Sequence, residues 1–273
     1  MSIEPNDSPK FINKQQKIAA NFDEKTFDEY ADLYEKMFMA PYRQYLEIPT
    51  LEGLLGDLSG LKVLDFGCGP GFLSRWLHSK GAESVVGYDI SEGMLDYAKF
   101  KEKQQPQGIS YLSALDDSLT GEFDLVLAVY VMPYAPDKEK LLSMSQAMAR
   151  LLKSGGRLIT LPIHPDFHSD PEYYRPYGLR LLEKEPRTDG SIVNLHICQP
   201  PYNVNIDAHY WSAETLMATL ERAGFHSLSW RQLQLPINEP SSGVSLSDYL
   251  HVPHAAIIDG IKGGGTVDNQ GRG

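Results

Sequence analysis

The feature that most constrains the fold is an alternation of short apolar runs with longer amphipathic segments between Leu61 and Pro162. The apolar runs are KVLDF, SVVGYD, ISYL, FDLVLAVY and GRLITLP, and segments such as FLSRWLHSK and DKEKLLSMSQAMARLLK lie between them. Continuous apolar strands separated by helices are typical of a parallel sheet that is covered on both faces. The sequence therefore predicts a doubly wound, Rossmann-like α/β sheet, with Gly155-Gly156 as the turn that stops the long helix before its strand.

The flanking regions predict further elements around this sheet. Apolar residues recur at helical spacing over 27–38, after a capping-box pattern at Thr26 and Glu29, and a second helix is predicted over about 42–55. Beyond Pro162, SIVNLHIC and HSLSWRQLQL are predicted strands, and SAETLMATLERAGF is a helix that Ser212 caps and Gly224 ends. We therefore expect N-terminal helices within 1–60, an α/β domain over 61–262 with an insert over about 162–211, and a disordered tail over 263–273.

The stretch VLDFGCGPGF places an acid and three glycines at the end of the first predicted strand. Gly67, Gly69 and Gly71 leave backbone N–H groups open to a ligand where the strand turns into a helix. The third glycine comes one residue earlier than in the dinucleotide fingerprint G-x-G-x-x-G, which disfavours a dinucleotide-dependent oxidoreductase. Asp65 would repel a pyrophosphate but suits a ligand with an ammonium or sulfonium group.

A second acid, Asp89 in GYDIS, ends the next predicted strand. It lies in the window, about 20 residues on, where a carboxylate takes the hydroxyls of a ribose. Together with Asp65, it indicates a ligand that combines a nucleoside with a cationic amino acid.

The segments VLDFGCGPG, GYDIS and FDLVLAVYVMPYA resemble class I S-adenosylmethionine-dependent methyltransferases, and YWSAETLMATLERAGF is similar to the family's late helix. The resemblance covers about Leu61 to Pro162 closely. It implies an enzyme that uses S-adenosyl-L-methionine and releases S-adenosyl-L-homocysteine. Carried over residue by residue, it implies a cofactor site of Asp65, Gly67, Gly69, Gly71, Asp89, Ile90, Met94, Ser113, Ala114, Leu115, Val129 and Tyr130.

One part of this match departs from the family pattern. Many members have Gly-Asp-Ala after the third strand, where the Asp binds the adenine amino group, whereas this chain has YLSALDDS. Ser113 takes the position of that Asp, so the adenine contact falls to Ser113, to the backbone near Ala114 and Leu115, or to a shifted Asp116.

The insert over about 162–211 is the expected lid over the methyl acceptor, because it follows a strand whose carboxyl end borders the cofactor crevice. His164 and His168 follow that strand and are candidate general bases, with Tyr134 as a third candidate for the catalytic site. Aromatic side chains suit a planar acceptor and a cationic methyl group. The candidate acceptor contacts are Tyr30, Tyr34, Tyr173, Tyr174, Tyr177 and Trp211, although their helical spacing favours packing in the core for Tyr30 and Tyr34.

The sequence leaves three functions open, which differ in the methyl acceptor or in whether methyl transfer occurs at all. For a ring nitrogen or amine with an available lone pair no base is needed, and alignment with the methyl donor suffices. The N-terminal helices, the insert and SLSDYLHVPHAAIIDGIK resemble small-molecule methyltransferases of bacterial secondary metabolism, including those that N-methylate azapteridines in toxoflavin-type pathways. This resemblance implies N-methylation of a small planar molecule. A hydroxyl acceptor would need a base such as His, giving an O-methyltransferase, and a non-catalytic nucleoside-binding module is the third alternative. An aminopropyl transferase would need acidic diamine-binding residues that have no evident place here.

Composition limits the partners. With 25 basic and 36 acidic residues the formal net charge is -11, which disfavours nucleic acid and anionic membranes as partners and leaves a small-molecule acceptor. Cys68 and Cys198 are too few for a disulfide framework or a metal cluster, so no metal is expected. Without an apolar signal segment at the start or a membrane-length apolar run, we expect a cytoplasmic protein, either a monomer or a homodimer.

Overall fold

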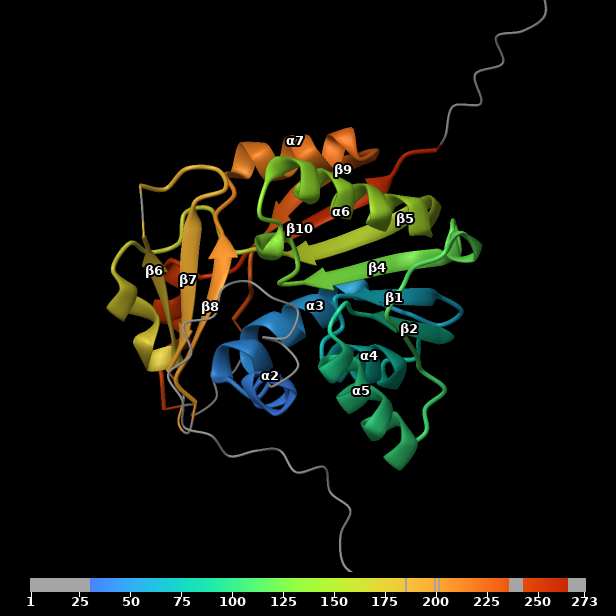
Figure 1. Cartoon of the computed structure of the whole chain (residues 1–273), viewed down its shortest axis with the longest axis horizontal. Coiled ribbons are helices and arrows are strands. Elements are labelled where there is room, and N and C mark those ends of the chain that lie inside the picture. The colour runs from blue at the N-terminus through green and yellow to red at the C-terminus, as the bar shows by residue number, and fades with distance from the viewer. Residues whose placement is uncertain (1–29, 185, 199, 201, 236–242, 265–273) are drawn as a thin grey trace, which may run out of the picture.

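A seven-stranded sheet, ordered β3-β2-β1-β4-β5-β10-β9, forms the centre of the protein (Figure 1). The structure is a computed structural model and describes residues 30–184, 186–198, 200, 202–235 and 243–264. The strands of this sheet are β1 (Lys62–Phe66), β2 (Ser84–Tyr88), β3 (Ser110–Leu112), β4 (Phe123–Val129), β5 (Leu152–Leu161), β9 (Phe225–Arg231) and β10 (Ile257–Lys262). The expected α/β class is therefore confirmed.

Helices cover both faces of this sheet. They are α3 (Ile48–Leu55), α4 (Phe72–Ser79), α5 (Glu92–Gln104), α6 (Lys138–Leu151) and α7 (Ala213–Arg222), with short 3₁₀ turns η2 (Asp117–Leu119) and η3 (Met132–Tyr134) between elements. Successive strand residues point to opposite faces, so Val63 packs in the apolar cluster that contains Leu73 and Leu77 of α4. Leu64 packs instead in the cluster with Leu141 of α6 and Leu216 of α7. Both faces of β1 are thus buried, which explains its continuous apolar sequence.

The sheet is not entirely parallel, because β10 runs antiparallel between β5 and β9. The sequence analysis did not identify β10, since its core IIDGIK contains an acid and a glycine. Asp259 of β10 is buried and accepts hydrogen bonds from Arg157 of β5 at 2.9 Å and from Arg231 of β9 at 3.0 Å. These two pairs tie the three strands together across the edge of the sheet.

The junction between α6 and β5 differs from the prediction. The helix ends at Leu151 and the strand begins at Leu152, so Gly155 and Gly156 lie inside β5 and not in a turn before it. The register with β4 shifts between Phe123 and Leu125, and Gly155 adopts a φ of 76°, which favours glycine. The glycines therefore form an irregularity within the strand.

The N-terminal segments match the two predicted helices where the chain is described. The helix α2 spans Ala31–Met37, and the capping-box pattern at Thr26 and Glu29 lies outside the described residues, as do residues 265–273 of the expected tail. The second predicted helix consists of a π-helical turn, η1 (Arg43–Glu47), followed by α3. Pro49 near the start of α3 lacks an N–H and crowds the carbonyl four residues earlier, and the wider π-turn before it accommodates this.

The insert after Pro162 forms a separate antiparallel sheet, ordered β6-β7-β8. It contains the 3₁₀ segment η4 (Pro171–Tyr177) and the strands β6 (Leu179–Glu183), β7 (Ile192–Ile197) and β8 (Val204–His209), of which only β7 was predicted. The predicted helix follows as α7, with the Ser212 hydroxyl accepting from Thr215 N at its start and Gly224 at its end. A short helix α8 (Leu246–His251) precedes β10.

The arrangement leaves the carboxyl ends of the parallel strands facing the insert. In Figure 1 the arrowheads of β4 and β5 point toward the β6–β8 sheet, and α2 lies between that sheet and α4. Ligands of open α/β sheets bind at this edge, outside the carboxyl ends of the strands. Among the described residues, no helix has the length and apolar character needed to cross a membrane.

Candidate active site

A cavity of about 420 Å³ lies at the carboxyl edge of the sheet. Its walls come from the glycine loop after β1, the ends of β2 and β4, the segment from α2 to η1, and the strands of the insert. Nine of the residues singled out from the sequence line it, namely Tyr34, Gly67, Gly69, Asp89, Ile90, Met94, Val129, Tyr130 and Tyr134. The cavity thus joins residues expected for the cofactor with residues expected for the acceptor.

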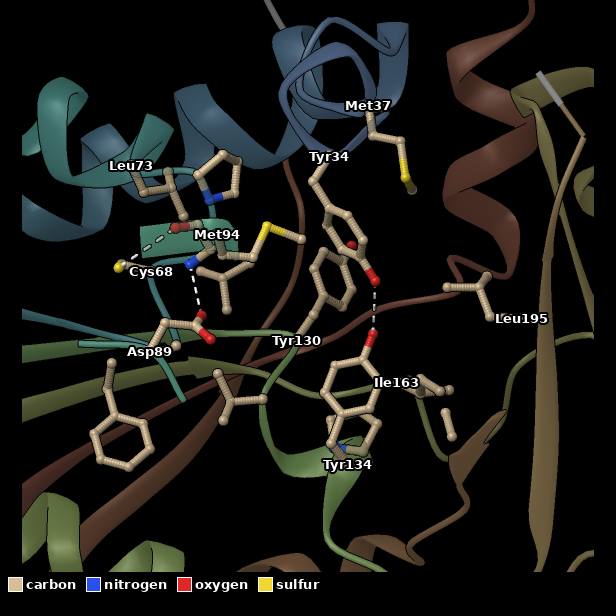
Figure 2. Close-up of a pocket in the computed structure, with 18 of the residues that line it drawn as sticks. Tyr34, Met37, Cys68, Leu73, Asp89, Met94, Tyr130, Tyr134, Ile163 and Leu195 are labelled. Carbon is tan, nitrogen blue, oxygen red and sulfur yellow. Dashed lines mark hydrogen bonds between the residues drawn. The ribbon is translucent and has the colours of Figure 1, made fainter. Parts of the chain in front are cut away.

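The glycine loop is held open by hydrogen bonds from its own backbone. Gly67 N and Cys68 N both donate to the carbonyl of Tyr88, at 2.7 and 2.8 Å. Gly69 N donates to the Asp89 carboxylate at 2.7 Å, as Figure 2 shows, and the other Asp89 oxygen accepts from Ser91 N at 2.9 Å. Asp89 is therefore locked in place by backbone donors on both oxygens while its side chain lines the cavity.

The three glycines serve different purposes in this loop. A Cβ on Gly67 would lie 2.4 Å from Val131, and one on Gly71 would lie 2.6 Å from the Tyr111 hydroxyl, so both positions are required by packing. A Cβ on Gly69 would meet only the Met94 sulfur, at 4.0 Å, because the residue borders the cavity. Gly71 does not line the cavity, and its φ of 78° places it as the residue that starts α4.

Asp65 lies behind the glycine loop and not on the cavity wall. It is only 1% exposed, and its carboxylate accepts a hydrogen bond from the Ser74 hydroxyl of α4 at 2.6 Å. Burial raises the pKa of Asp65 to about 7 against the opposing effect of Ser74, and the nearby Asp89 raises it further. Asp65, expected in the cofactor site, thus lies outside the cavity lining, and its hydrogen bond fastens α4 to β1.

The segment after β3 does not reach the cavity. Ser113 and Ala114 are exposed, Leu115 is partly exposed, and the cavity lining includes none of the three. The carboxylate of Asp116, the other candidate, caps the η2 turn by accepting from Ser118 N at 2.8 Å. Ile90 does line the cavity and is 52% exposed, so the cavity opens to solvent at this end.

Two tyrosines face each other across the middle of the cavity. The hydroxyls of Tyr34 on α2 and Tyr134 on η3 lie 3.3 Å apart (Figure 2). Burial raises the pKa of both phenols, so both stay protonated at neutral pH. Tyr30 begins α2 and packs beside Ala31 and Tyr97, away from the cavity lining.

His164 and His168, the candidate bases, do not line the cavity. The Nδ1 atom of His164 accepts from Asp166 N at 2.9 Å, and that of His168 accepts from Asp170 N at 3.0 Å, so each ring stabilises a local turn. The ring of His168 also stacks on Tyr173, with centroids 4.2 Å apart. Both histidines, expected as candidate general bases, therefore lie outside the cavity lining.

The aromatic residues of the insert pack instead of forming a cage. The hydroxyls of Tyr173, Tyr174 and Tyr177 donate to the backbone carbonyls of residues 248, 252 and 245, which fastens η4 to the region of α8. Trp211 is 4% exposed and belongs to the apolar cluster under α7. All four were expected to contact the acceptor, and the structure places all four outside the cavity lining.

A buried polar network, which the sequence did not predict, lies on the cavity wall. Arg43 Nε donates to Glu47 at 3.0 Å, and both side chains are at most 5% exposed. Tyr130, at the end of β4, donates to the same carboxylate and contacts His254 Nε2 at 3.2 Å. Arg43, Tyr130 and His254 line the cavity. Arg43 and Glu47 are four residues apart on η1, but Tyr130 and His254 are distant in sequence, so no local pattern could reveal that they join this pair.

The sequence also did not predict that apolar side chains of the insert form one wall of the cavity. It is formed by Leu179 of β6, Leu195 of β7 and Ala208 of β8, with Met37 of α2 opposite. Figure 2 shows Asp89 and Cys68 at one end of the cavity, Met37 and Leu195 at the other, and Tyr34, Tyr130 and Tyr134 between them. The cavity therefore has a polar end at the glycine loop and an apolar end at the insert.

The residues at the polar end fit a nucleoside that carries an amino acid. Asp89 presents a fixed carboxylate suited to ribose hydroxyls, and Gly69 leaves room that a side chain would fill. Within the described residues, Arg43 hydrogen-bonds through Nε alone, which leaves its terminal nitrogens for a ligand carboxylate. The Arg43 guanidinium is stacked on Phe38, 3.8 Å from the ring centroid, and Phe38 stacks in turn on Phe72 at the start of α4.

Comparison with known proteins agrees with this geometry. A methyltransferase-domain family model matches residues 63–156. A ubiquinone biosynthesis O-methyltransferase from Dechloromonas aromatica is 29% identical over 177 residues, covering 60% of this chain and 74% of the relative. One from Coxiella burnetii is 36% identical over 113 residues, covering 40% of this chain and 47% of the relative.

A solved structure shares the fold. The S-adenosylmethionine-dependent methyltransferase from Mesorhizobium loti aligns with a TM-score of 0.57 and 22% identity, over 79% of this chain and 97% of that protein. The family match spans the glycine loop, Asp89 and β4, which are the parts that form the polar end of the cavity. The chain therefore contains a methyltransferase domain, within the fold of S-adenosylmethionine-dependent methyltransferases.

Proposed function

We propose that this enzyme methylates a hydroxyl group of a small, flat and largely apolar molecule that binds at the insert end of the cavity. The observation that carries the proposal is the continuity of one cavity from Gly69 and Asp89 to Leu195 and Ala208. A methyl donor at the first end and an acceptor at the second would meet beside Tyr130. The insert would then act as the lid over the acceptor.

The apolar end defines the class of acceptor. Its wall of Leu179, Leu181, Leu195 and Ala208 offers no charged group, so an ionic or strongly hydrated acceptor would lose hydration without compensation. The hydroxyls of Tyr34 and Tyr134 lie between the two ends of the cavity and suit a single heteroatom of the acceptor. This combination favours an aromatic or heterocyclic molecule with few polar substituents.

The sequence left two alternatives for the atom that accepts the methyl group, a nitrogen and a hydroxyl oxygen. N-methylation in secondary metabolism was implied by the resemblance of the segments outside the core, and O-methylation was tied to His164 or His168, neither of which lines the cavity. The relatives reported above are named O-methyltransferases, and the polar network of Glu47, Tyr130 and His254 provides groups that can receive a proton. We therefore favour a hydroxyl acceptor.

The protein would contribute positioning and exclusion of water. S-adenosylmethionine supplies its methyl group from a sulfonium, and methyl transfer of this kind is an in-line displacement that depends on alignment. Asp89 and Arg43 would hold the ribose and the methionine carboxylate, which fixes the donor at the polar end. The insert strands would exclude water from the acceptor and hold it close to Tyr130.

Two variants test whether the insert end holds the acceptor. Ala208→Leu fills that end and is expected to lower methyl transfer at least about tenfold, while S-adenosylhomocysteine binding measured by calorimetry stays within about threefold, since a misplaced acceptor loses proximity. Ala213→Leu, on the first turn of α7, is the matched control. Phenols and nitrogen heterocycles would both be screened as acceptors, and mass spectrometry would detect transfer of a labelled methyl group to each. Unchanged transfer in Ala208→Leu, or methylation of nitrogen heterocycles alone, would contradict the proposal.

A further inference from the structure

The polar network beside the cavity is unusual for a pocket with an otherwise apolar wall. Glu47 is 1% exposed and His254 is 5% exposed, and both lie next to Tyr130. They come from η1, from the segment between α8 and β10, and from the end of β4, so three separate parts of the chain converge on one phenol. Buried charges and imidazoles are costly unless they are paired, which makes this arrangement a candidate for chemistry.

The positions of the protons follow from the donors and acceptors. A carboxylate only accepts, so the Tyr130 hydroxyl donates its proton to Glu47. The contact between Tyr130 and His254 Nε2, at 3.2 Å, then requires a proton on that nitrogen. His254 Nδ1 is left as an acceptor for the Tyr249 hydroxyl at 2.5 Å. The Tyr130 oxygen keeps one lone pair, and Tyr130 lines the cavity.

The backbone of Tyr130 is held in a sparsely populated conformation. Its φ is 58°, in the left-handed region that non-glycine residues seldom adopt. Such a conformation persists only where the surroundings impose it, and it is found preferentially at functional sites. Tyr130 N donates to the Leu161 carbonyl at 2.9 Å, and its hydroxyl is fixed from two sides, so the residue is anchored at both ends.

The charges around the network set its protonation. Burial raises the pKa of Glu47, and Arg43 and Tyr130 offset this only in part. Burial lowers the pKa of His254 to about 3, helped by the charge of Arg43 and by His164, so His254 is neutral at neutral pH. Tyr42 and Tyr249, which pack against His254, are buried phenols with raised pKa values. Glu47 is thus the group of the network best suited to take up a proton.

We propose that Tyr130 and Glu47 form a proton relay that deprotonates a hydroxyl acceptor during methyl transfer. The acceptor O–H bond breaks as its proton passes to the Tyr130 oxygen, and the Tyr130 proton passes to the Glu47 carboxylate. The electron pair left on the acceptor oxygen forms the bond to the methyl carbon, and the electrons of the broken carbon–sulfur bond remain on sulfur. The products are a methyl ether, S-adenosylhomocysteine and a protonated Glu47, which later returns its proton to solvent.

His254 and Arg43 have supporting parts in this relay. The Nε2–H of His254 points at the Tyr130 oxygen and stabilises negative charge there, so His254 is a positioning residue. Arg43 favours the ionised form of Glu47 through their hydrogen bond at 3.0 Å, against the effect of burial on the pKa of Glu47. The inference rests on the proposed function, because a nitrogen acceptor with a free lone pair would need no relay.

The test is Tyr130→Phe assayed with phenols of graded acidity. With weakly acidic phenols the turnover number is expected to fall at least about 100-fold, the usual range for loss of proton transfer. With nitrophenols that are already ionised at the assay pH, it should fall by less than about threefold, since no proton remains to be moved. Tyr177→Phe, which removes a hydroxyl that binds the Ser245 carbonyl outside the cavity, is the matched control. An equal loss for both groups of phenols, or no loss, would overturn the relay.

A second measurement avoids turnover. The enzyme with bound S-adenosylhomocysteine would be titrated with 4-nitrophenol, whose absorbance reports its ionisation. The relay predicts that wild-type protein lowers the apparent pKa of the bound phenol and that Tyr130→Phe does not. Equal pKa values in the two proteins would overturn the relay, even where methyl transfer to phenols stands. If the wild type binds S-adenosylhomocysteine but methylates no phenol, both the proposal of a hydroxyl acceptor and the proposal of a relay are wrong.

Discussion

Replacing Asp89 by asparagine is expected to weaken binding of S-adenosylhomocysteine by about 10- to 150-fold. The carboxylate accepts from Gly69 N at 2.7 Å and from Ser91 N at 2.9 Å, and its side chain also lines the cavity. The two backbone donors hold the group in the orientation that would meet a ribose. Asparagine has nearly the same shape, but its amide offers one acceptor oxygen where the carboxylate offers two.

The magnitude follows from the hydrogen bonds that are lost. A hydrogen bond to a charged group contributes about 1.5–3 kcal/mol, and each 1.4 kcal/mol corresponds to a tenfold change in affinity. A ribose hydroxyl that donates to an ionised Asp89 would lose that contribution when the charge is removed. One backbone N–H would also face the amide nitrogen, which adds a smaller cost in loop stability.

Calorimetric titration with S-adenosylhomocysteine at 25 °C would measure the effect, with thermal melts of the same proteins to confirm folding. Asp96→Asn, an exposed position on α5, is the matched control and should bind like the wild type. A change of less than about threefold in Asp89→Asn, with the fold intact, would refute the assignment of Asp89 to the cofactor.

Two further predictions concern the glycine loop and the acid behind it. Gly69→Val should abolish detectable cofactor binding, because a side chain is strained at a φ of 51° and would also occupy the cavity. Gly53→Ala, where an added Cβ has no neighbour within 4 Å, is the control and should bind normally. Equal affinity of Gly69→Val and wild type by calorimetry would contradict this prediction. Asp65 has a pKa of about 7 in the folded protein, above its value of about 3.9 when unfolded, so its stabilising effect is present at low pH and is lost as pH rises through this range. Asp65→Asn, which keeps an acceptor for Ser74, should therefore flatten the pH dependence of the melting temperature between about pH 4 and pH 7, and identical pH profiles would show that Asp65 titrates normally.

The parts of the molecule that were predictable are those specified by local sequence. The strands β1, β2 and β4 are continuous apolar runs, and the glycines follow β1 directly, so their place at the strand end could be deduced from spacing. Asp89 was identified for the same reason. Its hydrogen bond to Gly69 N links the two motifs that were recognised separately.

The elements that were missed depend on distant partners. The strand β10 is stabilised by pairing on both sides and by the contacts of Asp259 with Arg157 and Arg231, which no local pattern reveals. Likewise β6 and β8 are short and complete a sheet only around β7.

The same reason explains why the candidate bases lie outside the cavity lining. His164 and His168 follow a strand whose end lies near the cavity, but each ring turns back to accept from a backbone N–H two residues on. His254 is about 90 residues further along the chain and reaches the cavity because α8 and β10 bring it beside Tyr130. Burial of Arg43 and Glu47 could not be foreseen, because charged residues in a helical segment are usually solvent-exposed.

The most direct test of the account is methyl transfer by the wild-type protein from S-adenosylmethionine with a labelled methyl group to a panel of phenols. The account predicts that labelled methyl ethers and S-adenosylhomocysteine form in equal amounts, and that Ala208→Leu lowers both without loss of cofactor binding. If the protein binds the cofactor but transfers no label to any phenol, the proposed acceptor is wrong. If S-adenosylmethionine does not bind at all, the central claim that this cavity holds the cofactor is contradicted.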